Sequence, residues 1–142
     1  MDHNSLNIDQ HTLQAYLNTT YVTKKPDLTI KIGEVNQPLN VFLFDNNSFF
    51  WAFISAANPY STVLSDEENE LHYNDLIESV KTLNLRYCEG FGVPDDKQWK
   101  PEKSLLILDI SKKDATELGK KYKQNAIVFG KIHQAPELIF CN

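Results

Sequence analysis

The stretch from Phe49 to Tyr60, FFWAFISAANPY, decides the fold of this chain. Its first half is a continuous apolar and aromatic run without polar alternation, which is typical of a short β-strand covered on both faces. Side chains of a strand point alternately to its two faces. The predicted sets are Phe49, Trp51 and Phe53 on one face, and Phe50, Ala52 and Ile54 on the other. We therefore expect a central strand with a layer of helix or loop on each face.

The same stretch ends at Asn58-Pro59, where proline removes a backbone donor and keeps Asn58 out of the helical region. A polar amide therefore follows the end of the predicted central strand. In sheets with helical crossovers, ligands bind just beyond the carboxyl ends of the strands. Asn58 is accordingly a candidate ligand contact, and capping of its own turn is the alternative interpretation.

Length and composition predict one domain over residues 1–142. The chain is 42% hydrophobic and 11% aromatic, which is enough for a single core.

A net charge of −5 and the lack of any Lys/Arg cluster larger than a pair argue against a nucleic-acid partner. The sequence starts without a basic segment followed by an apolar one, and no apolar run reaches the length of a membrane span. We expect a cytoplasmic protein without a membrane anchor.

Motifs for metals, disulfides and cofactors are missing from the sequence. Cys88 and Cys141 stand alone without a CxxC spacing, which favours two unpaired thiols in a reducing compartment. The four histidines are scattered and give no metal-binding spacing. The glycines of Gly90–Gly92 precede no helix directly, so they do not form a dinucleotide fingerprint. We expect neither a metal nor a cofactor.

Hydrophobic periodicity and turn residues predict the remaining elements. Helices are expected at about 9–18, 39–44, 66–83 and 112–122, and strands at 19–23, 28–32, 49–54, 85–89, 104–110, 125–130 and 137–140. The 39–44 segment also fits a strand, because its apolar run is short. The order of these elements predicts an α/β (α+β) fold, a mixed sheet with helices packed against it.

The helix near 66–83 carries the clearest local signals. Ser65 stands three residues before a glutamate, which is the spacing of a capping box. Asn69 lies on the apolar stripe of this helix, four residues before Tyr73. Because an amide on a buried stripe needs partners, we expect Asn69 to be buried and hydrogen-bonded near the Asn58 turn.

Two assumptions about topology bring further polar side chains to this edge of the sheet. If the 66–83 helix joins parallel strands and the next connection returns antiparallel, the strand near 104 begins where the strand near 49 ends. A right-handed crossover through the 112–122 helix then starts the strand near 125 at the same edge. The resulting candidate ligand-binding set is Asn58, Asn69, Glu102, Ser104, Gln124 and Asn125.

The segments FISAANP, SDEEN, WKPEKS and QNAIVFG occur in an order and at intervals that resemble a family of small bacterial proteins, domain of unknown function 3293. The resemblance covers about residues 21–130. The family pattern falls on eight positions: Asn58, Pro59, Asn69, Glu102, Ser104, Gln124, Asn125 and Ala126. Ser55 and Lys103 depart from it, where threonine and a second glutamate are usual. The resemblance implies no activity, and Lys103 argues against a mechanism that uses paired carboxylates.

Three functions remain open from the sequence. The favoured one is a module that binds a small polar or nucleotide-like ligand through an amide-rich site, which suits a neutral or mildly anionic ligand. The first alternative is an enzyme that uses Glu102 as general acid or base, although a surface carboxylate paired with Lys100 or Lys103 is the favoured interpretation of this residue. The second alternative is a protein-interaction adaptor with an exposed aromatic patch. Phe91 and Trp99 are expected in one loop, either as the anchoring core of that loop or as a stacking platform.

Overall fold

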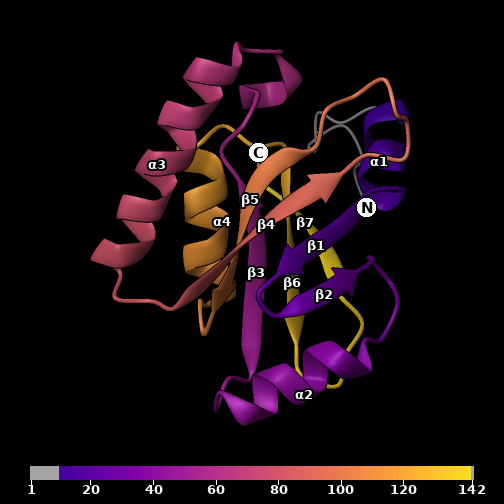
Figure 1. Cartoon of the computed structure of the whole chain (residues 1–142), viewed down its shortest axis with the longest axis vertical. Coiled ribbons are helices and arrows are strands. Elements are labelled where there is room, and N and C mark those ends of the chain that lie inside the picture. Colours follow the sequence, from indigo (N-terminus) through magenta and orange to yellow (C-terminus); the bar gives the residue numbers. More distant parts are fainter. Residues whose placement is uncertain (1–9, 142) are drawn as a thin grey trace.

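A computed structural model describes residues 10–141 and shows a curled sheet with helices against it (Figure 1). Over these residues the sheet has seven strands in the order β2-β1-β4-β5-β3-β6-β7. The strands are β1 (Thr20–Lys24), β2 (Asp27–Ile30), β3 (Phe50–Ser55), β4 (Tyr87–Val93), β5 (Glu102–Leu108), β6 (Ala126–Lys131) and β7 (Glu137–Phe140). The helices are α1 (Gln10–Leu17), α2 (Gln37–Asp45), α3 (Asp66–Thr82) and α4 (Lys112–Lys121), and a 3₁₀ turn spans Pro59–Ser61. The α+β class and the packing of helices on a sheet are thereby confirmed.

Each pair of neighbouring strands in the described sheet is antiparallel, so the expectation of a mixed sheet is wrong in this respect. The cause is that the two helical crossovers interleave. Helix α3 joins β3 to β4, which run in the same direction but have β5 between them, and α4 joins β5 to β6 across β3. The assumed strand directions are therefore correct, although no parallel strands are neighbours.

The alternation of side chains along β3 divides the core into two layers, as the sequence predicts. Ala52 and Ile54 belong to the layer beneath α3 and α4, which lie together on one side of the sheet (Figure 1). Trp51 and Phe53 belong to the other layer, which α2 helps to cover. Strand β3 is an interior strand one place from the centre, and Phe49 precedes it with 61% of its surface exposed.

Local capping explains where two helices begin. The Ser65 side chain accepts from the Glu68 N–H at 3.1 Å, and the Glu68 carboxylate returns to the Ser65 backbone, which confirms the capping box of α3. The ambiguous 39–44 segment is helical because Asn36 caps it, accepting from the Leu39 N–H at 2.9 Å.

Strand β4 extends further than its sequence predicts, because it includes the glycines at 90 and 92 that we placed in a loop. Gly90 pairs with Thr23 on one side and with Ser104 on the other. A side chain at Gly90 would meet the ring of Phe53 at 2.9 Å, so the absent side chain is what admits this ring. The loop to β5 accordingly begins at Pro94.

Candidate functional site

The six predicted site residues lie where β3 ends and where β5 and β6 begin. At this edge the segment Ser55–Ser61 leaves β3 and passes the start of α3. We call this place the Glu102 edge, after the carboxyl group at its centre. Hydrogen bonds connect the predicted residues to this edge.

Asn58 and Asn69 bind each other through two hydrogen bonds. The Asn58 N–H donates to Asn69 Oδ1 at 2.9 Å, and Asn69 Nδ2 donates to Asn58 Oδ1 at 2.9 Å. Asn58 Oδ1 also accepts from the Leu64 N–H at 2.9 Å. The expected hydrogen bonding of Asn69 is confirmed, although this residue is partly buried instead of fully buried. Both amide oxygens are thus occupied within the protein, so these two residues act as a brace.

The loop after β3 has an unusual backbone. Asn58, Tyr60 and Ser61 adopt left-handed conformations, with φ values of 46°, 50° and 65°. Residues with side chains other than Asn and Asp seldom adopt this region, and strained backbone of this kind is concentrated at functional sites. The loop is held at its centre, where the Tyr60 N–H donates to the Lys123 carbonyl at 2.7 Å.

Glu102 has a different partner from the one that its sequence neighbours suggest. Asn58 Nδ2 donates to Glu102 Oε2 at 3.0 Å. The flanking lysines form ion pairs with acids of α3: Lys100 with Asp66 at 3.2 Å and Lys103 with Glu70 at 2.7 Å. The interpretation of Glu102 as the ion-pair partner of Lys100 or Lys103 is therefore wrong, because α3 offers closer carboxylates to both lysines.

The surroundings of Glu102 favour its neutral form. Burial raises the pKa of this carboxyl group above its ordinary value, and the hydrogen bond from Asn58 opposes that effect without cancelling it. Within the described residues, Asn58 is the hydrogen-bond partner of the Glu102 side chain, and it occupies only Oε2. The other oxygen, Oε1, is left to water or to a ligand.

The remaining predicted residues also reach this edge, mainly through backbone groups. Ser104 is buried and donates to the Glu102 carbonyl at 3.0 Å, and buried Gln124 donates to the Ala57 carbonyl at 3.0 Å. Asn125 Nδ2 donates to Ser61 Oγ at 3.1 Å. The first two side chains position the segments around Glu102, whereas Asn125 is partly exposed at the loop.

Two tyrosines at the Glu102 edge were not among the predicted site residues. Gly92 of β4 pairs with Tyr21 of β1 on one side and with Glu102 of β5 on the other. The side chains of Tyr21 and Glu102 therefore project from the same face of the sheet, and the glycine between them carries no side chain. Tyr16 of α1 is partly buried, and burial raises the pKa of its hydroxyl to about 12. A tyrosine in an apolar helix stripe gives no signal in the sequence that separates packing from a role in a site.

Phe91 and Trp99, which we expected in one loop, are separated by the extension of β4. Phe91 is a partly buried residue of this strand. Trp99 stays in the loop before β5 and has 56% of its surface exposed. Phe91 and Trp99 therefore do not form one exposed aromatic patch.

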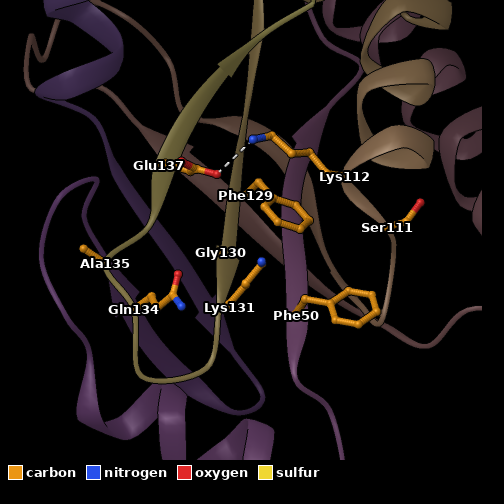
Figure 2. A pocket seen from close by; sticks show the side chains of 9 residues that line it. All are labelled: Phe50, Ser111, Lys112, Phe129, Gly130, Lys131, Gln134, Ala135 and Glu137. Carbon is orange, nitrogen blue, oxygen red and sulfur yellow. Dashed lines mark ion pairs between the residues drawn. The ribbon is translucent and has the colours of Figure 1, made fainter.

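A pocket of about 440 Å³ lies at the opposite end of the sheet, where β3 begins and β6 ends. Figure 2 shows the Lys112–Glu137 ion pair on one side of it, with Lys131 and Gln134 on another. The ion pair spans 3.4 Å between two side chains that are each 56% exposed. Such exposed ion pairs contribute little, and Lys131 adds a further positive charge to the lining. None of the six predicted site residues lines this pocket.

Residues 10–141 contain no group of three His, Cys, Asp or Glu side chains that could hold a metal ion. None of the helices there combines the length and apolar character needed to cross a membrane. Cys88 and Cys141 are both free thiols, as expected.

Comparison with known proteins gives one family. Residues 54–127 match the family model described as Protein of unknown function (DUF3293). The match includes every one of the six predicted site residues, and it leaves out Tyr16 and Tyr21. Neither a curated protein nor a solved structure matches the chain.

Proposed function

The chain belongs to the family described as Protein of unknown function (DUF3293), and from this premise we propose that it binds a small polar ligand at the Glu102 edge. The observation that carries the proposal is the burial and hydrogen bonding of the Glu102 side chain. Its carboxyl group is partly buried, is held in place by Asn58, and has one oxygen without a partner in the described structure.

The Glu102 carboxyl group has capacity for further hydrogen bonds. A carboxylate can accept about four hydrogen bonds, and Asn58 supplies one of them, at Oε2. The Asn58–Asn69 brace fixes this group at the edge, instead of letting it turn to the nearby lysines. A ligand that donates a hydrogen bond to Oε1 would therefore meet an acceptor that is already held in place.

The hydrogen bonds support a division of the six residues into two groups. Asn58, Asn69, Ser104 and Gln124 use polar atoms on other parts of the chain, so we assign them as positioning residues. We assign the ligand contacts to Glu102, through Oε1, and to Asn125, whose Nδ2 donates to Ser61 and whose Oδ1 is the atom offered to the ligand. A neutral or nucleotide-like molecule with hydrogen-bond donors fits this pair, and the isolated thiols support a cytoplasmic location for it.

A thermal-shift screen of nucleotides and metabolites tests this proposal. A ligand that binds the native state raises the melting temperature, and the rise grows with the logarithm of the ligand concentration once that concentration exceeds Kd. Glu102→Gln should reduce that shift, and the matched control Glu137→Gln, which changes the pocket at the opposite end, should leave it unchanged. A shift lost in Glu137→Gln and kept in Glu102→Gln would place the ligand in the pocket of Figure 2 and refute the proposal.

A second candidate function is acid or base catalysis by Glu102. The observation that favours it is the raised pKa of this carboxyl group, because a proton-transfer group works best when its pKa approaches the pH of the cell. A hit from the screen is therefore also assayed for conversion. Turnover that disappears in Glu102→Gln while binding is kept would establish the enzyme, whereas unconverted ligand leaves the binding function.

A further inference from the structure

We propose that the pocket at the opposite end of the sheet is a second binding site, for an aromatic carboxylate whose charge partner is Lys131. This site is independent of the proposed function, because none of its lining residues belongs to the Glu102 edge. The pocket encloses about 440 Å³, which lies in the range of about 300–1,000 Å³ that small-molecule sites usually have. It is therefore large enough for a ligand with two fused rings.

The sheet register brings four of the lining side chains to one face. Phe50 of β3 pairs with Lys131 of β6, and Phe129 of β6 pairs with Glu137 of β7. Because positions 129 and 131 are two residues apart on one strand, all four side chains project from the face that α4 covers. Phe129 is buried and Phe50 is half-buried, whereas both charged side chains are exposed. The two rings consequently form the base of the pocket, and the charged groups form its rim (Figure 2).

Lys131 supplies a positive charge that the protein leaves unpaired. The Lys112 ammonium group is 3.4 Å from the Glu137 carboxylate, so these two charges balance each other. In the part of the chain that the structure describes, the Lys131 ammonium group has no hydrogen bond or ion pair, and neither has the side-chain amide of Gln134. The pocket thus keeps one unpaired cation in a protein whose net charge is −5.

The loop that carries Lys131 and Gln134 is held in place by its backbone. The N–H groups of Ile132, His133 and Gln134 all donate hydrogen bonds, at 2.8, 2.8 and 3.0 Å. The acceptor for His133 is the side chain of Asn40, a buried residue of α2. A loop that is already ordered loses little conformational freedom when a ligand binds. The Lys131 and Gln134 side chains are therefore presented from a fixed base.

The free groups of this pocket match an aromatic monocarboxylate. The Lys131 ammonium group and the amide NH₂ of Gln134 are donors, so together they suit the two oxygens of one carboxylate. The rings of Phe50 and Phe129 offer apolar surface to a flat ring. A dianionic phosphate would meet a single unpaired cation close to the Glu137 carboxylate, so its second charge would have no partner. A neutral ring would leave Lys131 without one.

Titration with 2-naphthoate, followed by NMR, tests the site. The backbone amide signals of Gly130 and Ala135, which line the pocket, should shift as the probe binds. 2-Naphthamide has nearly the same shape without the charge and should bind at least about tenfold more weakly. Lys131→Met removes the ammonium group, keeps an unbranched side chain, and should weaken naphthoate binding by about tenfold. The matched control is Lys113→Met, which removes an exposed lysine of α4 outside the lining and should leave the affinity for naphthoate unchanged.

Several outcomes overturn the inference. Naphthoate that does not bind, or that binds no better than naphthamide, excludes a carboxylate site. Equal losses in Lys131→Met and Lys113→Met show that binding follows the net charge of the protein, and unmoved Gly130 and Ala135 signals at saturating naphthoate place the probe elsewhere. Binding that is lost in Glu102→Gln and kept in Lys131→Met places naphthoate at the Glu102 edge, which supports the proposed function and refutes the second site. A ligand screen that finds no dependence on Glu102 refutes the proposed function alone.

Discussion

Replacement of Asn58 measures how firmly the loop holds Glu102. The Asn58 side chain forms three hydrogen bonds, with Glu102, the Leu64 N–H and Asn69, at 3.0, 2.9 and 2.9 Å. Two bonds between neutral groups at about 1 kcal/mol each, and one to a carboxyl group at about 1.5–3 kcal/mol, would together contribute about 3.5–5 kcal/mol. Because Asn58 is partly exposed, water replaces part of this sum. We expect Asn58→Gly to lower the free energy of unfolding by about 2–4 kcal/mol.

The backbone conformation of residue 58 makes a second contribution to the free energy of unfolding, and this contribution depends on which residue replaces Asn58. Asn58 has φ 46° and ψ 67°, a left-handed conformation that glycine adopts freely and alanine does not. Asn58→Ala should therefore be less stable than Asn58→Gly by about 1 kcal/mol. This order is the reverse of the usual one, because alanine is ordinarily the more stabilising of the two.

Urea denaturation followed by tryptophan fluorescence gives both quantities, since Trp51 is fully buried. Asn47 is the matched control: it is exposed, has φ 54°, and its alanine and glycine variants should differ by the backbone term alone. A loss below about 1 kcal/mol in Asn58→Gly would show that the three hydrogen bonds do not stabilise the fold. An alanine variant at least as stable as the glycine variant would refute the left-handed conformation.

Three further changes have defined outcomes. Since the pKa of Glu102 is raised above 4.5 in the folded protein, stability falls as the pH rises from 4.5 through the folded pKa. The stability of Glu102→Gln relative to wild type should therefore increase across that window, and a pH-independent difference in denaturation experiments would contradict this. In Gly130→Ala the new methyl group would lie 2.5 Å from the Trp51 ring, so we expect a loss of about 1–3 kcal/mol by calorimetry. Ser65→Ala removes the capping box and should lower the unfolding free energy by about 0.5–2 kcal/mol, while an unchanged melting temperature would argue against the cap.

Local features of the fold could be predicted from the sequence because their causes are local. The two faces of β3 follow from alternation, and the start of α3 follows from the spacing of Ser65 and Glu68. The order of the strands has no such cause. Whether β5 inserts between β3 and β4 depends on how two helices share one face of the sheet, and this information is not present in any single segment.

The candidate site shows the same limit. The strand directions alone predict that the six site residues lie at one edge of the sheet, and the structure has these directions. The partner of Glu102 could not be predicted, because it depends on the αL turn at Asn58 and on the acids of α3 that draw away Lys100 and Lys103.

The interleaved order of the strands has a consequence for folding during synthesis on the ribosome. Strand β3, FWAFIS, is uncharged and rich in aromatic residues, and it contains no proline or glycine, which are properties of segments prone to aggregation. Its neighbours β5 and β6 are both synthesised later, and Trp51 pairs first with Leu108 and then with Gly130. The nascent chain therefore exposes its most apolar strand until nearly the whole sheet has been translated. Folding before that point is restricted to the β1–β2 hairpin and isolated helices, so slow translation or a chaperone that shields this segment should improve the yield of native protein.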